Sequence, residues 1–372
     1  MLKILHFADL HLDSSFAGLG FPSLTARKYR EALKDAFVRI INLATEKKVD
    51  IITIGGDLYE HERFTRDTGE FLRTQLQSLG GKKIFIAPGN HDPWMPESMY
   101  HYLDWSDNVH IFQTSSFSPI RLAANVTLWG MAHCSFSNHK NPVENFKVDR
   151  QGINVLLFHG SDMSNIPPNK GKHAPFNLEN LEATGADVAL LGHYHRGKIG
   201  ESAKIKLIYP GSPEPLGFAE KGMHSVALVS INNNQIEIET FPVNHYNFVQ
   251  MQVDVSNANT RDEIKNLIEK SVREQSSKTT LFRIEITGQI HPELDLDLAL
   301  LKEQVFINSN EGQLINKTKP CYDFESLSQE NTVRGEFVRR IKMMQENAIL
   351  DEKEKLQQAL LFGLNAFESK ER

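Results

Sequence analysis

The chain is poor in cysteine and has no long run of apolar residues. Only Cys134 and Cys321 occur among 372 residues, and two cysteines without metal-type spacing form neither a disulfide framework nor a zinc site of the cysteine type. No segment reaches the roughly 20 apolar residues of a membrane-spanning helix. The stretch MLKILHFADLH lacks the basic start, long apolar middle and cleavage site of a signal peptide. We therefore expect a cytoplasmic protein without a membrane partner.

The chain also lacks an excess of basic residues. It has 41 lysines and arginines against 47 acidic residues, a formal net charge of −6 and a pI near 6.2. Proteins that bind nucleic acid without sequence preference usually carry a basic surface. A polyanionic substrate would therefore need bound metal, a local basic loop or a partner protein to be attracted to this chain.

The first part of the chain alternates strand-like and helix-like segments. The apolar runs KILHFA, VDIITIGG and KKIFIAPG read as strands, and residues 23–48 and 65–79 between them have helical periodicity, with Ser23 as the expected N-cap. This order predicts a parallel sheet covered by helices. From Val109 the pattern becomes strand-rich and ends in a hairpin across Asn232, Asn233 and Asn234. We predict an α/β catalytic domain over residues 1–245, a sandwich of two sheets flanked by helices.

The pattern changes after this domain. Residues 246–320 alternate strand-like and helical segments, which predicts a small α+β capping domain. Residues 321–372 form a helical tail, with helices expected over 332–345 and 351–368. The tail either packs on its own domain or docks a partner helix.

Polar side chains follow five of the predicted strands. The strand exits read DLH, GGDLYE, GNHD, FHGS and GHYH. Any one of them alone is typical of a turn or a solvated strand end. Side chains two residues apart on a strand point the same way, and ligands of open α/β sheets bind at the carboxyl ends of strands. We therefore expect these residues to converge on a metal site: Asp9, His11, Asp57, Asn90, His91, His159, His193 and His195.

The chemistry of this set favours particular metals. It offers carboxylate and amide oxygens and imidazole nitrogens but no thiolate, which suits Mn²⁺, Fe or Zn²⁺. Even seven ligands are too many for one ion with an open position, whereas two divalent ions that share Asp57 could use seven. Such a pair activates a water as hydroxide and neutralises a phosphoryl oxygen. The glycines before Asp57, Asn90 and His193 let the backbone approach the ions.

These motifs, in this order, resemble the five signatures of the calcineurin-like metallophosphoesterase superfamily. ADLHLDSSF near the start, YPGSPEPLGFAE at residues 209–220, the small capping domain and TVRGEFVRR in the tail are similar to one branch of it, the SbcD-type DNA repair nucleases and their YhaO-like relatives. The resemblance implies a phosphodiester hydrolase with two metal ions, most often Mn²⁺, that cleaves DNA by attack of a metal-bridging hydroxide.

The resemblance also assigns roles to single residues. It implies that one metal is held by Asp9, His11, Asp57 and His195. The other would be held by Asp57, Asn90, His159 and His193. His91 matches the family's catalytic histidine, which stabilises the transition state and helps protonate the leaving oxygen; a supporting hydrogen-bonding role is the alternative. Asp92 is expected to form a turn.

One position departs from the family pattern. Many of the family's double-strand DNA nucleases have a second non-ligand histidine three residues after the bridging aspartate, where this chain has Glu60, followed by His61. This puts exonuclease activity in question and leaves phosphodiester hydrolysis intact. Substrate contacts are expected from Lys170 and Lys172 in the loop 161–177 and from Arg196 beside the ligands, unless these are ordinary solvated charges.

The resemblance further implies partners: DNA, a coiled-coil SbcC-like ATPase that docks on residues 332–368, and a second copy of the chain. Three functions stay open. The chain is a DNA repair nuclease subunit, a phosphatase or phosphodiesterase with a non-DNA substrate, or a catalytically weak DNA-tethering scaffold. The 127 residues after the catalytic domain favour the first over the second, and the complete ligand set favours an enzyme over a scaffold.

Overall fold

The computed structural model describes residues 1–20, 22–148, 151–166, 171–275, 279–292, 294, 296–306 and 311–368. The chain divides into two compact units, Met1–Phe248 and Val249–Arg372. The three-part division expected from the sequence stays a prediction.

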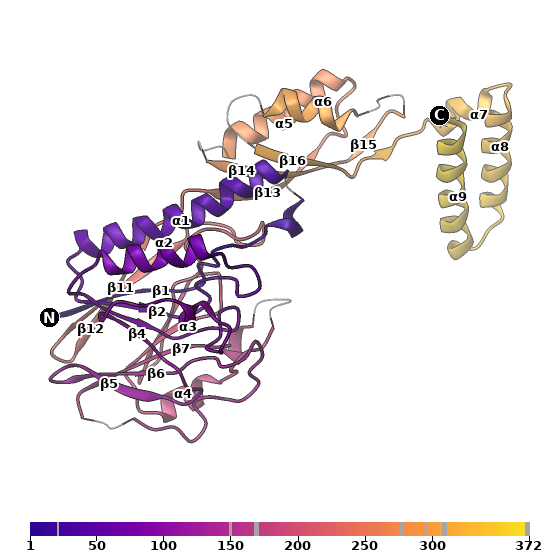
Figure 1. Ribbon diagram of the computed structural model, residues 1–372. Helices are drawn as coiled ribbons and strands as arrows, with labels where there is room; N and C mark the ends of the chain where they lie inside the picture. Colours follow the sequence, from indigo (N-terminus) through magenta and orange to yellow (C-terminus); the bar gives the residue numbers. More distant parts are fainter. Residues whose placement is uncertain are drawn as a thin grey trace. The chain divides into compact units, whose positions relative to one another are not determined.

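The first unit contains two six-stranded sheets (Figure 1). The first has the order β12-β11-β1-β2-β3-β4, in which β1 to β4 are parallel and β11 pairs antiparallel with β1. Its strands are β1 (Leu2–Phe7), β2 (Ile51–Ile54), β3 (Lys83–Ile86), β4 (Val109–Ile111), β11 (Ser225–Asn232) and β12 (Gln235–Pro242). The second has the order β5-β6-β7-β8-β10-β9. Its strands are β5 (Ser118–Ala123), β6 (Val126–Gly130), β7 (Ile153–His159), β8 (Val188–Gly192), β9 (Lys198–Glu201) and β10 (Lys206–Tyr209).

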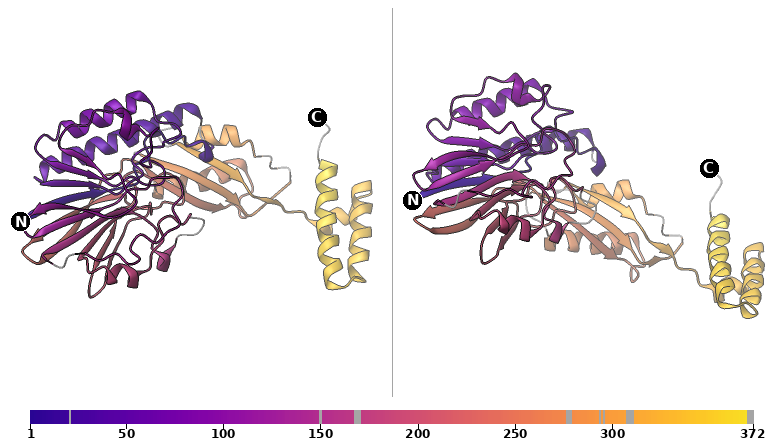
Figure 2. Two further views of the ribbon diagram at one scale, coloured as in Figure 1. Left: turned by 60° about the horizontal axis from the view of Figure 1, so that its bottom comes forward. Right: turned by 90° about the horizontal axis from the view of Figure 1, so that it is seen from below.

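Helices flank the two sheets. The long α1 (Ser23–Glu46) and α2 (Arg66–Gln77) lie side by side against the outer face of the first sheet in all three views (Figures 1 and 2). Helix α1 buries the apolar face expected from its periodicity, which includes Phe37 and Ile40. Its first residue is Ser23, and Pro22, not Ser23, occupies the N-cap position. The shorter helices of this unit are α3 (Met99–Tyr102), α4 (Leu178–Ala183) and two 3-10 turns, Ala17–Leu19 and Met163–Asn165.

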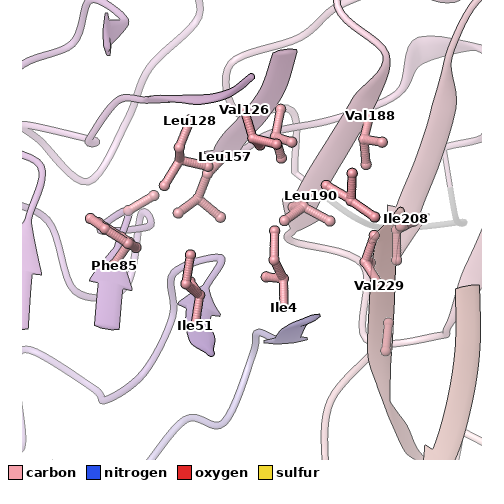
Figure 3. Close-up of a cluster of buried hydrophobic side chains, with 14 of the residues drawn as sticks. Ile4, Ile51, Phe85, Val126, Leu128, Leu157, Val188, Leu190, Ile208 and Val229 are labelled. Atoms are coloured by element: carbon pink, nitrogen blue, oxygen red, sulfur yellow. The ribbon is translucent and has the colours of Figure 1, made fainter. Parts of the chain in front are cut away.

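The core lies between the two sheets. Ile4, Ile51 and Phe85 of the first sheet face side chains of the second (Figure 3). These opposing side chains are fully or almost fully buried and include Val126, Leu128, Leu157, Val188 and Leu190. Strands covered on both faces are largely apolar, as in β7, where all seven residues are buried and five of them are apolar. The predicted α/β sandwich is therefore confirmed.

The second unit has a small α+β part and a helical tail. Strands β13 (Asn247–Asp254), β14 (Thr280–Thr287) and β16 (Glu311–Asn316) form a sheet, and β15 (Gln289–Ile290) pairs with β17 (Lys319–Pro320). The helices of this part are α5 (Arg261–Gln275) and α6 (Leu298–Val305). The tail consists of α7 (Phe324–Gln329), α8 (Val333–Glu346) and α9 (Leu350–Glu368). No helix in the described part of the chain is long and apolar enough to cross a membrane.

The tail helices bury one apolar face and expose another. Val338 of α8 and Leu360 and Leu364 of α9 form a small core with Tyr322. Other large apolar side chains on these helices and on the connection between them are exposed: Val333, Met343, Met344, Ile349, Leu350, Phe362 and Phe367. The tail therefore packs on itself and still presents apolar surface.

Candidate metal centre

The strand exits of β1 and β2 are joined by backbone hydrogen bonds. The amide of Asp9 donates to the carbonyl of Gly56 at 3.0 Å, and the amide of His11 donates to the carbonyl of Asp57 at 2.9 Å. The amide of His193, at the exit of β8, donates to both carboxylate oxygens of Asp9 at 3.0 and 3.1 Å. Three exits from two different sheets are thereby held together.

Backbone strain is concentrated at these exits. Asp9, His11 and Asp57 have φ angles of 55°, 50° and 53°, and His193 has a φ of 112°. Residues with a side chain rarely adopt positive φ, and clusters of them occur where the surrounding structure fixes a functional geometry. The fold therefore imposes the directions of these four side chains.

Two glycines allow the exits to approach one another. A Cβ on Gly89 would lie 2.3 Å from Oδ1 of Asp57, and a Cβ on Gly192 would lie 2.1 Å from the carbonyl oxygen of Gly55. Both distances are far below van der Waals contact. Only glycine therefore permits Asn90 and His193 to reach the other donors.

The predicted ligands come together in overlapping groups. Their donor atoms lie within 4.8 Å of one another in three sets: Asp9, His11 and His195; His11, Asp57 and His91; Asp9, Asp57 and His159. The ring of His193 lies 5.1 Å from that of His159, and Oδ1 of Asn90 lies 3.1 Å from Nε2 of His159. The structure thus brings all eight predicted residues to one place. Their individual roles stay predictions.

The arrangement around His159 fits a cation. Its Nδ1–H donates to the carbonyl of Gly55 at 2.8 Å, so in the neutral ring Nε2 carries a lone pair. This nitrogen lies 3.1 Å from Oδ1 of Asn90 and 3.2 Å from Oδ2 of Asp57, which are also acceptors. Burial is the largest single influence and lowers the pKa of His159, but the charge and hydrogen bond of Asp57, together with Asp9 and the Gly55 carbonyl, raise that pKa overall. Three converging lone pairs require a positive charge among them, as a divalent ion would supply.

A second pair of donor atoms also fits a metal site. Nε2 of His11 and Oδ2 of Asp57 are buried, lie 3.6 Å apart, and have no hydrogen-bond partner among the described residues. Burial lowers the pKa of His11, which favours its neutral form. A neutral imidazole and a carboxylate oxygen left unsatisfied inside a protein are typical of metal ligands.

Two glutamates orient His11 and His195, which belong to the set with Asp9. Oε1 of Glu60 lies 2.7 Å from Nδ1 of His11, and Oε1 of Glu220 lies 2.7 Å from Nδ1 of His195. Although burial opposes it, hydrogen bonds from the histidines lower the pKa of each glutamate to about 2. A carboxylate on Nδ1 fixes the tautomer and directs Nε2 to a metal.

His159 and His193 are oriented by backbone carbonyls instead of carboxylates. His159 donates to the Gly55 carbonyl, and Nε2 of His193 lies 2.9 Å from the carbonyl of Gly171. Nδ1 is therefore the ring nitrogen of His193 that could hold an ion. The two candidate metal positions therefore differ. Carboxylates orient His11 and His195, whereas backbone carbonyls orient His159 and His193.

His91 differs from the buried ligands in its exposure. Its side chain is 42% exposed, its Nδ1 lies 2.9 Å from Oε2 of Glu60, and its amide donates to Oδ1 of Asp57 at 2.8 Å. The same glutamate thus holds His91 and His11. Glu60, which departs from the family pattern, connects a predicted metal ligand with the predicted catalytic histidine.

Asp92 fixes the loops that present Asp57 and Asn90. It is fully buried and accepts hydrogen bonds from the amides of Asp57, Leu58 and Gly89 at 2.9, 2.7 and 2.6 Å and from the hydroxyl of Tyr100 at 2.6 Å. It orders the turn, as the sequence suggested.

A pocket of about 440 Å³ opens beside the ligands. It is lined by Ser14, Ser15, Glu60, His61, Glu62, Arg63, Asn90, His91, Phe136 and His173. Of the predicted substrate contacts, Arg196 and Lys172 are exposed but do not line this pocket, and Lys170 lies outside the described residues. Their role in substrate binding stays a prediction.

Two features of the site escaped the sequence analysis. Glu220 was noted only as the last residue of YPGSPEPLGFAE, and its distance of 25 residues from His195 gives no periodic signal. Phe136 belongs to a loop without any motif. The one signal in the sequence that could have identified Glu220 was its position at the end of YPGSPEPLGFAE, the segment that resembles the nuclease branch.

The chain is similar to several known proteins. The metallophosphoesterase YhaO of Bacillus subtilis is 25% identical over 284 residues, which cover 72% of this chain and 67% of YhaO. The DNA double-strand break repair protein Mre11 of Methanopyrus kandleri is 25% identical over 306 residues, which cover 72% of this chain and 63% of that protein. The matches thus span about two thirds of these relatives or slightly less. A dimetal phosphatase from Danio rerio, 12% identical, matches with a TM-score of 0.41 over 66% of this chain and 99% of its own.

The family predicted from the strand-exit motifs is confirmed by a match to residues 2–197. This segment is more than half of the chain and contains all eight predicted site residues. The chain belongs to the calcineurin-like phosphoesterase family.

Proposed function

We propose that this chain is a two-metal phosphodiesterase that cleaves nucleic acid and works as the nuclease subunit of a DNA repair complex. One observation supports it most: seven metal-type donors converge at a set of strand exits, and His91, held by Glu60, lies half exposed in the pocket beside them. Two relatives with matches over most of this chain are a metallophosphoesterase and a DNA double-strand break repair protein.

The donor set would hold two divalent ions, with Mn²⁺ our first choice. One position would use Asp9, His11 and His195, the other Asn90, His159 and His193, and Asp57 would serve both. When bound, such a pair acidifies a water to give a nucleophile near neutral pH and neutralises charge on the phosphoryl group.

The chain's own residues supply the proton for the leaving oxygen. Nδ1 of His91 donates to Glu60, so in the protonated ring Nε2–H is the group that would donate to a leaving alkoxide in the pocket. The carboxylate of Glu60 stabilises the protonated ring and keeps its orientation. Buried Asp57 and Asp9 repel a phosphate in the absence of cations, so substrate binding would depend on metal ions being bound by the ligand residues.

The exposed apolar residues of α8 and α9 support a partner for the tail. We propose that an SbcC-like coiled-coil ATPase docks there and that DNA reaches the pocket within that complex. A homodimer is part of the same proposal and rests only on the family resemblance.

The proposal is tested by hydrolysis with the purified chain. Bis-p-nitrophenyl phosphate and labelled single- and double-stranded DNA are incubated with Mn²⁺, and metal content is measured in parallel. We expect about two equivalents of metal and cleavage of both substrates. Asp57→Asn should lose metal and activity, and His91→Ala should keep metal and lose at least about 100-fold in kcat. His110→Ala, which alters an exposed histidine of β4, is the control.

The alternatives give different results. Cleavage of the small diester without cleavage of DNA, alone or with an ATPase partner, would indicate a phosphodiesterase with another substrate. A chain that binds DNA but hydrolyses neither compound would be a scaffold and would contradict the proposal.

A further inference from the structure

An exposed aromatic side chain stands in the pocket that contains His91. Phe136 is 43% exposed, although phenylalanine is usually buried, and it lines the pocket together with His61, Asn90 and His91. Its ring packs edge to face against the ring of His61, with centroids 5.3 Å apart. The metal ligands and His91 do not require this aromatic surface.

The loop that presents Phe136 is fixed at its base. His133, three residues earlier, is fully buried, and its amide donates to the carbonyl of Pro88 at 2.9 Å. Its carbonyl accepts from the amide of Trp94 at 2.7 Å, and its Nε2 lies 2.8 Å from the carbonyl of His159. These contacts tie the loop to the exits of β3 and β7, from which Asn90 and His159 come.

The far side of the loop is fixed as well. The carbonyl of Asn138 accepts from the amide of Ala174 at 2.6 Å. Ala174 belongs to the same segment as Gly171, whose carbonyl holds His193. Phe136 therefore lies between two anchored points, and a ligand that stacks on it loses little free energy in ordering the loop.

Polar groups surround the aromatic surface. Arg63 is exposed, lines the pocket, and has no ion pair among the described residues. The hydroxyls of Ser14 and Ser15 line it too. A guanidinium and hydroxyls suit a phosphate next to the one that reacts.

We propose that Phe136 and His61 form a stacking surface for the base of an unpaired nucleotide, with Arg63 at the neighbouring phosphate. This inference rests on the proposed function and narrows its substrate to single-stranded or frayed ends. The faces of a base within a duplex are covered by its neighbours, so only an unstacked base can lie on an aromatic side chain. The pocket volume, about 440 Å³, lies within the roughly 300–1,000 Å³ typical of small-ligand sites.

The test compares two diesters with the same leaving group. Thymidine 5′-(p-nitrophenyl phosphate) carries a base, and methyl p-nitrophenyl phosphate does not. Stacking on an aromatic side chain contributes about 1–3 kcal/mol per base, so kcat/KM should be about 5- to 150-fold higher for the thymidine ester. Phe136→Ala should raise KM for the thymidine ester and so remove most of this preference, with a much smaller change in hydrolysis of the methyl ester. Phe136→Trp should retain it, and Phe362→Ala, at an exposed phenylalanine of α9, is the control.

A binding measurement separates this inference from the proposed function. Stacking quenches the fluorescence of a dinucleotide that contains 2-aminopurine, and we expect Phe136→Ala to raise its Kd by about tenfold. If neither diester is hydrolysed but binding depends on Phe136, the proposed function is wrong and the stacking surface stands. If the methyl ester is hydrolysed and both the preference and the Kd are unaffected by Phe136→Ala, the stacking surface is wrong and the proposed function stands.

Discussion

Oε2 of Glu60 lies 2.9 Å from Nδ1 of His91, while its other oxygen lies 2.7 Å from Nδ1 of His11. One carboxylate therefore positions both a predicted metal ligand and the predicted catalytic histidine. In the sequence, Glu60 stood out only as a departure from the family's double-strand DNA nucleases. In the structure it provides an interaction that a histidine at this position could not, because a neutral imidazole has only one acceptor nitrogen and so could accept from only one of the two rings.

We expect Glu60→Gln to lower kcat about 10- to 100-fold and to change KM little, because the amide holds His91 less firmly and no longer stabilises its protonated form. Steady-state hydrolysis of bis-p-nitrophenyl phosphate measures this. Glu62→Gln, at an exposed residue of the same pocket, is the matched control. Equal activity of the two variants would show that Glu60 only fills space.

Glu220 should affect metal binding more than catalysis. Its Oε1 holds His195, and its Oε2 accepts from the hydroxyl of Ser212 at 3.0 Å and from the amide of Leu216 at 2.9 Å. Loss of such an orienting carboxylate typically weakens metal affinity about 10- to 100-fold. We expect Glu220→Gln to need correspondingly more Mn²⁺ for half-maximal activity and to reach nearly the same kcat at saturation.

Direct metal titration by calorimetry checks this without relying on turnover. The control is Glu237→Gln, at an exposed glutamate of β12. A Glu220→Gln variant that binds Mn²⁺ as tightly as the parent chain would contradict a positioning role.

The two sides of the fold differ in how well they could be predicted from sequence. Strands β2, β7 and β8 are buried on both faces, so each appears as a mostly apolar run, interrupted by Thr53 in β2 and by Asn154 and the terminal His159 in β7. Strands β5 and β9 lie at the sheet edges, are only partly buried, and have no such run, so both were missed. Edge position alone does not explain the two missed strands, because the edge strand β12, whose apolar and polar residues alternate, was predicted.

The site shows the same contrast. The predicted ligands follow directly after apolar strands, so their convergence could be inferred from the sheet alone. Glu220 and Phe136 lie on loops whose paths depend on tertiary contacts, such as those of His133. Local sequence does not encode such paths, which is why the residues that orient and surround the site emerged only from the structure.

Asp92 offers a test of how the ligand loops are held. In Asp92→Asn, the amide nitrogen would face at least one of the buried N–H groups of Asp57, Leu58 and Gly89. An unsatisfied buried donor costs about 1–3 kcal/mol, so we expect the free energy of unfolding to fall by about 3 kcal/mol. For a domain of this size the melting temperature should drop by about 6–12 °C.

Tyr100→Phe provides the graded comparison. It removes one of the four hydrogen bonds to Asp92 and leaves the backbone donors satisfied, so its cost should be about 1 kcal/mol. Thermal unfolding of both variants in excess EDTA measures the difference in their melting temperatures. Similar melting temperatures for the two would mean that the loops are held by other contacts.

His6 links the two sheets inside the core. It is fully buried on β1, its Nε2–H donates to the carbonyl of Leu191 on β8 at 3.1 Å, and its Nδ1 accepts from the hydroxyl of Thr53 at 3.0 Å. This pattern satisfies the neutral ring completely. Burial lowers the pKa of His6 from 6.5 to about 4.

Because the folded-state pKa is depressed, the unfolded chain takes up the proton first as the pH falls. The contribution of His6 to stability is fully present above about pH 6.5 and is lost progressively between pH 6.5 and 4, by about 3 kcal/mol in total. His6→Gln has no such titration, although the substitution itself costs stability at neutral pH. We expect urea unfolding of the metal-free proteins to show that the difference in unfolding free energy between parent and variant shrinks by about 3 kcal/mol from pH 7 to pH 4. A difference that stays constant across this range would mean that His6 remains protonatable in the folded core and does not bridge the sheets as a neutral ring.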